Sequence, residues 1–419
     1  MKARPSRREV LGGAGVLAAA GAAFAIAGCS SDATSSTFPA AADQVVPFYG
    51  AHQSGVLTPP QDRLFFAALD LLSDDREALQ AILRAWSTAA PLLAAGHPVG
   101  PVEPANPDAP PTDTGEATGL PPSKLTVTVG LGRSVFVDAH GRDRLGLAHR
   151  LPDALVDIPS FGGGEILDPS RSGGDIGLQC CADDANVAFH AFRNLARIAR
   201  DYATVRWTQL GFGRAASTGT QETPRNLQGF KDGTNNLDVT DSALMRKYVW
   251  VDPSDGPSWM SGGTYMVTRR IRMRIEHWDR SAISDQEGTI GRAKLSGAPL
   301  GAHHEHDTPP LGAKGPDGKP VIPTSAHIRV AAPSENGGLR ILRRGYSFSD
   351  GITADTGELD AGLFFVAYQR DPRHQFIPLQ QHLANDDALN EYIVHETSAM
   401  FAVLPGVEEH DYLGRALFA

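Results

Sequence analysis

The sequence predicts an α+β protein built from two units, each an antiparallel sheet with helices on one face. Several short stretches alternate apolar and polar residues, which is typical of half-buried strands. Stretches with helical periodicity separate them, and short alternating strands favour an antiparallel sheet over a parallel one. The 419 residues are enough for two such units, which we expect to join near residues 215–225.

Composition excludes one class of partner. Hydrophobic residues make up 41% of the chain and charged residues 21%, which are ordinary values for a globular protein with a real core. The formal net charge is −10, so no basic excess is available to neutralise phosphates. We therefore expect no nucleic-acid partner.

The first 28 residues have the features of an export signal. Lys2, Arg7 and Arg8 give a basic start, and the string SRREVL at residues 6–11 is typical of a twin-arginine signal. Residues 11–28 carry no charge. A membrane-spanning anchor is the alternative, but this stretch is mostly Ala and Gly, and its weak hydrophobicity speaks against a span.

The segment that follows is expected to be a tether. The string IAGC at residues 26–29 resembles a bacterial lipobox, in which Cys29 becomes lipidated, and cleavage without a lipid is the alternative. Residues 29–44 are rich in Ser, Thr and Ala and would form a flexible link to the membrane. We expect a periplasmic or other extracytoplasmic protein. Twin-arginine cargo travels folded, and the usual reason is a cofactor inserted in the cytoplasm.

The first unit, expected over residues 45–220, alternates strands and helices. Residues 73–86 have one apolar helical face, with Ser73 or Asp74 placed to cap it. Residues 98–122 hold eight prolines and predict a surface loop. His190 lies near the buried stripe of a second helix, where a hydrogen-bonded core histidine is the simpler interpretation. Further elements are strands over residues 125–131, 177–180 and 204–207 and that second helix over residues 183–200.

The second unit, expected over residues 221–419, repeats the style. Residues 265–278 alternate strongly, and the string SDQE at residues 284–287 predicts a capping box for a short helix. Cys180 and Cys181 are neighbours, and since a ring between neighbouring cysteines strains the backbone, we expect two buried thiols. The remaining predicted elements are strands over residues 327–330, 346–348, 363–368 and 400–404 and a helix over residues 386–395.

Two local features could carry chemistry. The string GFKDGTN at residues 229–235 surrounds Asp232 with Gly, which lets the backbone approach a flat ligand and aims a carboxylate into a pocket. A plain Asp-Gly turn is the alternative. The string GAHHEHD at residues 301–307 could bind zinc or copper, although an exposed His-rich loop is the alternative. Walker, GxGxxG, HExxH and paired CxxC motifs are all absent from the sequence.

An ordered series of motifs resembles the dye-decolourising haem peroxidases, most closely their exported deferrochelatase/peroxidase (EfeB-like) subgroup. Residues 229–235 match the GxxDG signature of that family. The further matches run in order to the C-terminus and are VWV at residues 249–251, EHWDR at 276–280, GAPLG at 297–301, HEHD at 304–307, HIR at 327–329, LRRGY at 342–346, LFFV at 363–366 and LPGV at 404–407.

The resemblance implies two ferredoxin-like halves with one haem b in the C-terminal half. His327 matches the residue that binds the haem iron. Neutral imidazole binds ferric iron best when its other nitrogen donates to a carboxylate. We expect Glu391 to be that carboxylate, with Asp387 as the second choice.

The resemblance also implies the residues on the other face of the haem. Asp232 matches the acid that moves a proton between the two oxygens of peroxide, and Arg343 matches the arginine that stabilises the negative leaving oxygen. We expect the two to pair in the resting protein. The remaining residues expected to contact the haem are Gly233, Thr234 and Asn235 along its edge and Leu363 and Phe365 in a dry wall.

One stretch departs from the family. Where the family usually has Asn-Pro-Arg after the iron-binding histidine, this chain has Ala332, Pro333 and Ser334. These three residues are expected to contact the haem, but the arginine is missing, so propionate binding at that point is in doubt. Arg292 is a candidate contributor.

The expected activity follows from the resemblance. Hydrogen peroxide would oxidise the haem to a ferryl intermediate, which then oxidises an organic or dye-like reductant. Trp250, Trp259, Trp278 and Tyr346 are candidate electron relays, although core aromatics are the simpler interpretation. Two alternatives stay open: a haem- or iron-handling protein working with iron-uptake partners, and a copper or zinc lipoprotein without haem. Homo-oligomerisation also stays open.

Overall fold

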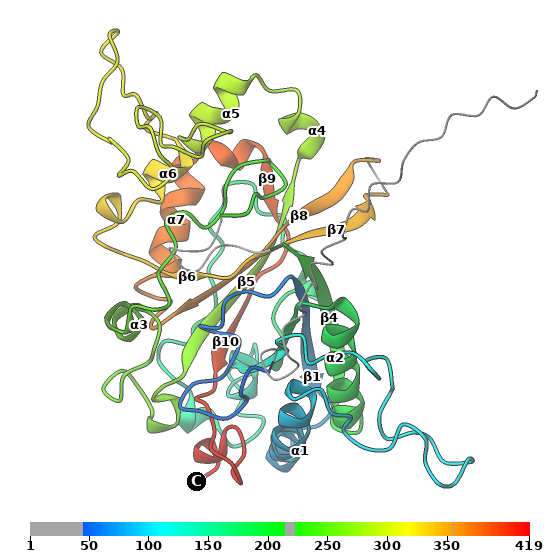
Figure 1. Ribbon diagram of the computed structural model, residues 1–419. Helices are drawn as coiled ribbons and strands as arrows, with labels where there is room; N and C mark the ends of the chain where they lie inside the picture. The colour runs from blue at the N-terminus through cyan, green and yellow to red at the C-terminus, as the bar shows by residue number, and fades with distance from the viewer. Residues whose placement is uncertain (1–44, 214–222, 355) are drawn as a thin grey trace, which may run out of the picture. The chain divides into compact units, whose positions relative to one another are not determined.

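The structure is a computed structural model, described here for residues 45–213, 223–354 and 356–419. The N-terminal half has the βαββαβ order of a ferredoxin-like unit, and its strands lie in the spatial order β4-β1-β3-β2. Its two helices, α1 and α2, lie side by side (Figure 1). Every pairing within it is antiparallel. Its elements are β1 (Arg63–Leu71), α1 (Arg76–Ala94), β2 (Thr126–Gly132), β3 (Ile176–Ala182), α2 (Ala185–Ala199) and β4 (Ala203–Phe212).

The C-terminal half repeats this topology. Its four main strands lie in the order β10-β5-β8-β7. Counted along the chain within each half, both halves therefore have the spatial order fourth, first, third, second. The strands are β5 (Thr264–Met273), β7 (Tyr346–Ile352), β8 (Leu359–Gln369) and β10 (Ala399–Val403), with the short strands β6 (Leu342–Arg343) and β9 (Ile393–His395) beside them. The predicted α+β class with two ferredoxin-like halves is therefore confirmed.

The helices of the two halves differ. In the N-terminal half, the long helices α1 and α2 form the two crossovers. In the C-terminal half, α7 (Phe376–Asp386) forms the second crossover, but the first contains only three short helices. These are α4 (Ile275–Trp278), α5 (Ile283–Ile290) and α6 (His327–Val330); α3 (Ser242–Tyr248) precedes β5. The crossover that the single long helix α1 forms in the N-terminal half thus consists of loops and short helices in the C-terminal half.

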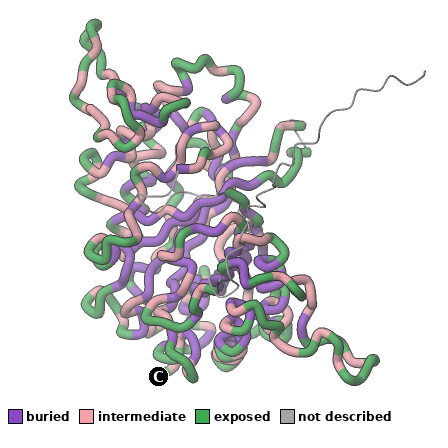
Figure 2. The backbone as a smooth tube through the Cα atoms, viewed as in Figure 1, coloured by how far each residue is buried: buried purple, intermediate pink, exposed green. Residues whose placement is uncertain are grey.

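The two half-sheets join at both ends, since β2 pairs with β10 and Phe212 of β4 pairs with Ser347 of β7. The joined sheet buries apolar side chains on both of its faces. On β1, Phe65 packs toward the helices while Phe66 packs into the space enclosed by the sheet. Figure 2 shows these strands as the most continuously buried part of the chain.

Local sequence explains the helix starts. Asp75 caps α1 by accepting from the backbone N–H of Glu77, and Asp184 caps α2 by accepting from Asn186 and Val187. The predicted cap of the first helix, Ser73 or Asp74, is wrong by one residue. The helix also continues past residue 86 to Ala94, because Ala89, Ala90 and Leu93 extend its buried stripe.

Several predictions about buried groups are confirmed. The segment over residues 98–122 is a loop, and Asp113 in it accepts from His190 Nε2 at 2.8 Å, so His190 is a hydrogen-bonded core residue. Cys180 and Cys181 are free and buried. Neighbouring residues on a strand point to opposite faces, and these two thiols accordingly belong to different apolar clusters.

Four predictions about local structure are wrong. Residues 327–330 form helix α6, not a strand, and residues 386–395 hold the end of α7, a 3-10 turn and β9, not one helix. The capping box expected at residues 284–287 is not formed: α5 begins after Ala282, without a side-chain cap. The strand expected over residues 265–278 ends at Met273, where Arg274 leaves the ladder.

The export signal, the lipobox with Cys29 and the tether lie outside the described residues, as does most of the expected junction near residues 215–225. Within the described ranges, no helix combines the length and apolar character that a bilayer span requires.

Candidate active site

An ion pair joins two residues that lie far apart in the sequence. Arg343 Nη1 donates to Asp232 Oδ1 at 2.8 Å, and both side chains are partly buried. Asn236 fixes their relative position, because its Oδ1 accepts from the backbone N–H of Arg343 at 2.9 Å and its Nδ2 donates to the Arg343 carbonyl at 2.7 Å. The expected resting pair between Asp232 and Arg343 is therefore present.

Backbone geometry holds the Asp232 turn. The N–H of Asp232 donates to the Pro224 carbonyl at 2.8 Å, and Gly233 follows with φ 111°. That φ lies in the region open to glycine, so a side chain at residue 233 would strain the turn. The sequence signature of Gly around one Asp reflects this turn.

His327 opens the short helix α6. Its Nδ1 donates to Asp387 Oδ2 at 2.5 Å, and the side chain of Asp387 is 3% exposed while that of His327 is 35% exposed. Because a carboxylate accepts at Nδ1, the lone pair resides on Nε2, which makes no hydrogen bond with any described residue. The imidazole therefore presents a free ligating nitrogen.

The surroundings of His327 make its imidazole more basic. Burial lowers the pKa of the imidazole, but the charge and hydrogen bond of Asp387 outweigh burial and raise that pKa above its ordinary value. Arg343 lowers it slightly and Asp232 raises it slightly.

The expected partner of His327 was wrong. Glu391 accepts from His277 Nε2 at 3.2 Å, and both side chains are exposed. Asp387 takes the place beside His327 because its other oxygen, Oδ1, accepts from the Leu389 N–H at 2.9 Å and starts a 3-10 turn. That turn carries Glu391 away toward α4.

An apolar wall lies on one face of β8. Leu363 and Phe365 are half-buried on that face, while Phe364 and Val366 point into the space enclosed by the sheet. The Phe365 ring contacts Phe376 of α7, with centroids 6.0 Å apart. Half-buried apolar side chains in the middle of a sheet, under short helices, leave a face that a flat apolar ligand can cover.

The other expected contact residues occupy two turns. Gly233 is buried, Thr234 is half-buried and Asn235 is exposed. Residues 332–334 follow α6 directly, and Asn336 ties them to it by donating to the Val330 and Ala332 carbonyls. In that segment Ala332 is buried, Pro333 is half-buried and Ser334 is exposed.

The His-rich loop has a different role from the metal site considered as an alternative. Among the described residues, no group of three or more His, Cys, Asp or Glu side chains is arranged to hold a metal ion. Asp307 accepts from the backbone N–H groups of His303 and His304. Glu305 instead contacts Lys231 and Thr234 beside Asp232. Sequence reasoning missed this contact. The only signal in the sequence is that Lys231 and Thr234 lie within two residues of Asp232.

Arg292 is almost fully buried, and its Nη1 donates to the backbone carbonyls of Gly297 at 2.7 Å and Glu305 at 2.9 Å. Burial lowers the pKa of its guanidinium. Trp250, Trp259, Trp278 and Tyr346 are all buried, as core aromatics are.

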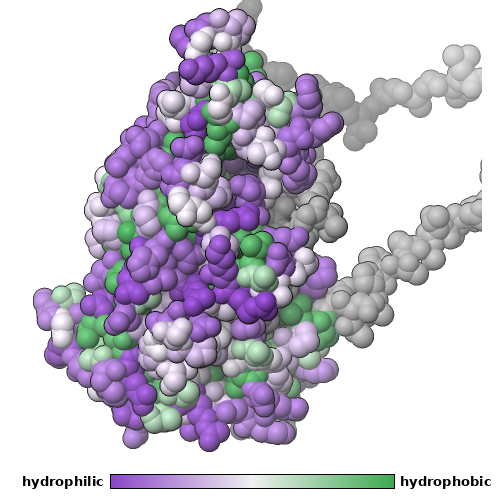
Figure 3. All heavy atoms as spheres, turned by 90° about the vertical axis from the view of Figure 1, so that its left-hand side faces the viewer, coloured by the Kyte–Doolittle hydropathy of each residue, from purple (hydrophilic) through white to green (hydrophobic). Residues whose placement is uncertain are grey.

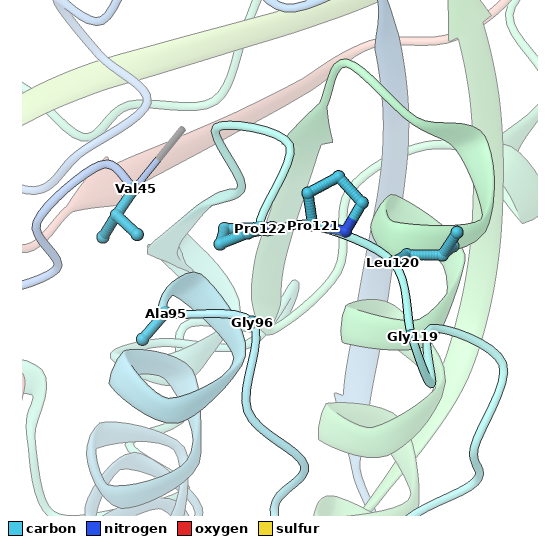
Figure 4. Close-up of a pocket in the computed structure, with 7 residues that line it drawn as sticks. All are labelled: Val45, Ala95, Gly96, Gly119, Leu120, Pro121 and Pro122. Carbon is cyan, nitrogen blue, oxygen red and sulfur yellow. The ribbon is translucent and has the colours of Figure 1, made fainter. Parts of the chain in front are cut away.

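A cavity of about 610 Å³ opens between the end of α1 and the end of the proline-rich loop. Figure 4 shows that its lining carries no titratable side chain, so we assign it no chemistry; the lining residues are Val45, Ala95, Gly96, Gly119, Leu120, Pro121 and Pro122. On the face shown in Figure 3, apolar side chains are scattered among hydrophilic ones.

Comparison with protein families gives two matches. The family model for the N-terminal part of Dyp-type peroxidases matches residues 53–213, and the model for their C-terminal part matches residues 223–408. Together the two models match most of the chain.

Individual proteins resemble the chain over nearly its full length. Proteins named deferrochelatase from Escherichia coli O157:H7 and Shigella flexneri are each 41% identical, over 99% of this chain and 97% of theirs. The structure of DtpA from Streptomyces lividans is similar with a TM-score of 0.82 and 40% identity, over 91% of this chain and 100% of that one. A DyP-type peroxidase from Cellulomonas bogoriensis gives a TM-score of 0.78 and 38% identity, over 90% and 99%.

Proposed function

This chain belongs to the Dyp-type peroxidase family and is a haem peroxidase, and on that premise we propose that His327 holds a haem b while Asp232 and Arg343 act on hydrogen peroxide. The reductant is an organic or dye-like molecule. One observation carries the proposal: the fold brings Asp232, Arg343, His327 and Asp387 from four separate segments into two hydrogen-bonded pairs, each at least partly buried.

The residues fit a haem. His327 leaves Nε2 without a hydrogen-bond partner among the described residues while Asp387 fixes the ring through Nδ1, and this is the arrangement that raises the basicity of a histidine ligand. Leu363 and Phe365 supply the apolar wall for a flat ring. When bound, haem supplies the electrons that reduce peroxide and then takes them back from a reductant.

Asp232 is placed to move a proton. Its carboxylate would take the proton from one oxygen of hydrogen peroxide and return it to the other oxygen, which leaves as water. The Arg343 guanidinium stabilises the negative charge that develops on the departing oxygen. The ion pair between the two residues fixes the direction of the Asp232 carboxylate.

Removal of the imidazole tests the haem site. We expect His327→Ala to abolish the Soret band of protein titrated with haem, because no other described side chain offers a nitrogen paired with Asp387. His374→Ala is the matched control, since His374 is exposed and bonds only Asp371. Unchanged haem binding in His327→Ala would contradict the assignment.

The second candidate is haem or iron handling, as the name of the deferrochelatase relatives suggests. No contact among the described residues explains how iron would leave an intact porphyrin. Release of iron from bound haem under reducing conditions, without turnover of a dye by peroxide, would favour this candidate. Dye turnover without iron release would favour the peroxidase.

We also propose that the protein is exported. The twin-arginine string at residues 6–11 and the lipobox ending at Cys29 support this route and a lipid anchor. Mass spectrometry of the mature N-terminus decides between a lipidated Cys29 and simple cleavage.

A further inference from the structure

Glu305 contacts the two residues on either side of the Asp232–Gly233 step. Its Oε2 forms an ion pair with Lys231 Nζ, and its Oε1 accepts from Thr234 Oγ1 at 3.0 Å. Lys231 and Thr234 flank the Asp232–Gly233 step, while the Asp232 side chain is turned toward Arg343. One carboxylate therefore holds both sides of the turn that presents the proton-transferring group.

We propose that Glu305 is a positioning residue for Asp232, holding its turn in place and balancing the charge of Lys231. This role rests on the proposed function of Asp232. It also gives a use to the His-rich loop, whose histidines gather no metal ligands in the described structure.

The loop that supplies Glu305 is itself firmly held. Arg292 donates from one nitrogen to the carbonyls of both Gly297 and Glu305, which ties the two ends of the loop together. A Cβ built on Gly297 would lie 2.7 Å from Lys231 Cδ and 3.5 Å from Glu305 Cγ. The Gly297 backbone therefore packs directly on the Lys231 side chain, and only glycine leaves room for it.

Burial makes this contact stronger than a surface ion pair. The side chains of Lys231 and Glu305 are 20% and 12% exposed, so solvent screens them less than an exposed pair. Burial raises the pKa of Glu305, but hydrogen bonds from Lys231, Thr223 and Thr234 outweigh it and lower that pKa below its usual range. Glu305 thus stays charged under mildly acidic conditions.

Charge balance gives the role a specific signature. Asp232 pairs with Arg343 on β6 and follows Lys231 directly in the chain, while Glu305 contacts Lys231 and His306 and has its carbonyl held by Arg292. Without the Glu305 charge, Lys231 becomes an uncompensated cation next to Asp232. That cation favours the carboxylate form of Asp232, so the acid limb of the pH–rate profile should move to lower pH.

The test uses haem-loaded full-length protein and the rate at which the Soret band changes on mixing with peroxide, measured across pH. We expect Glu305→Gln to bind haem with an unchanged Soret band, to react roughly 10- to 100-fold more slowly, and to show the shifted acid limb. The KM for the reductant should not change. Adding Lys231→Met should return the acid limb to its wild-type position while the rate stays low.

Asp307→Asn is the matched control, because Asp307 lies in the same loop but contacts only the backbone of His303 and His304. Wild-type rate and pH profile in Glu305→Gln, or equal slowing in Asp307→Asn, would overturn the positioning role. If Glu305→Gln does not fold, Thr234→Val removes one contact of Glu305, and an unchanged rate there would also overturn it. Asp232→Asn in the same series separates the two claims, since its normal reactivity would defeat the proposed function itself.

Discussion

At the scale of single residues, the proposed function assigns proton transfer to the carboxylate of Asp232. Asp232→Asn keeps the shape and one acceptor for Arg343 but cannot take up a proton. We expect haem binding to persist and the reaction with peroxide to slow by about 10²- to 10⁴-fold, the usual contribution of a positioned acid–base group. Stopped-flow spectroscopy measures this rate. Asp238→Asn is the control in the same segment, because Asp238 caps its own turn at Thr240.

In the proposed haem site, Asp387 acts through its hydrogen bond to His327. In Asp387→Asn the imidazole loses its charged acceptor and becomes a weaker ligand, so we expect haem affinity to fall about 10- to 100-fold. Titration of the apoprotein with haem measures the change. Asp386→Asn is a close control, because that exposed neighbour reaches only His382, at 3.5 Å. Equal losses in both variants would mean that Asp387 has no special role.

The sequence predicted Asp232, Arg343 and His327 because each lies in a recognisable motif. It did not predict the choice of Asp387 over Glu391. Both are acidic, they lie four residues apart, and the decision depends on a 3-10 turn that Asp387 itself starts. The contacts of Glu305 could not be predicted for a related reason: Glu305 contacts Lys231 and Thr234 only because two separate loops pack together.

At the scale of elements, patterns failed where they were short. The string HIRV at residues 327–330 alternates over four residues, too few to separate a strand from a helical turn. The structure forms a turn in which the Ala331 N–H donates to the His327 carbonyl at 2.9 Å. The sequence of β1 shows no alternation of apolar and polar residues, because the strand is buried on both of its faces. Longer periodic elements such as α2 were predicted within two residues.

Asp113 fastens the proline-rich loop to α2. Its carboxylate accepts from the Val99 N–H at 2.9 Å, the Gly115 N–H at 2.8 Å and His190 Nε2 at 2.8 Å. These hydrogen bonds outweigh the effect of burial and lower its pKa.

We expect Asp113→Ala to leave one buried donor and two partly buried donors without their acceptor. The free energy of unfolding should fall by roughly 2–4 kcal/mol, and proteases should cut the loop faster. Limited proteolysis read by mass spectrometry identifies the cleavage sites. Asp108→Ala, an exposed change in the same loop, should leave the cleavage rate unchanged. A loop equally resistant in Asp113→Ala would argue against this fastening.

At the scale of the whole molecule, the repeated strand order accounts for the position of the proposed haem site. Both halves share one topology, but the crossover that α1 fills in the first half carries α4, α5 and α6 in the second. The exchange of one long helix for short ones frees a sheet face and supplies His327. The joining of the two half-sheets was beyond sequence reasoning, because the contact between β4 and β7 consists of a single residue pair.

Stability of the whole fold should depend on pH through His395. Burial, and then the charge of Arg269, lowers its pKa from 6.5 to about 3. Below about pH 6.5 the unfolded chain takes up a proton that the folded chain refuses, so stability falls as the pH drops from about 6.5 toward 3. Above that window this residue contributes no pH dependence.

Chemical denaturation at several pH values checks this. Over the full window the loss from this residue is of the order of 4 kcal/mol. His395→Gln should flatten the stability curve between pH 6.5 and 4, while His374→Ala, at an exposed site, should not. An unchanged slope in His395→Gln would show that the buried imidazole does not control acid stability.

The most direct test of the account is the optical spectrum of protein supplied with haem, recorded before and after mixing with one equivalent of hydrogen peroxide. We predict a strong Soret band that shifts rapidly on mixing and returns when a reductant is added. A Soret band without a response to peroxide would contradict the roles of Asp232 and Arg343 and favour haem handling. Absence of a Soret band in well-folded protein would contradict the haem site built on His327.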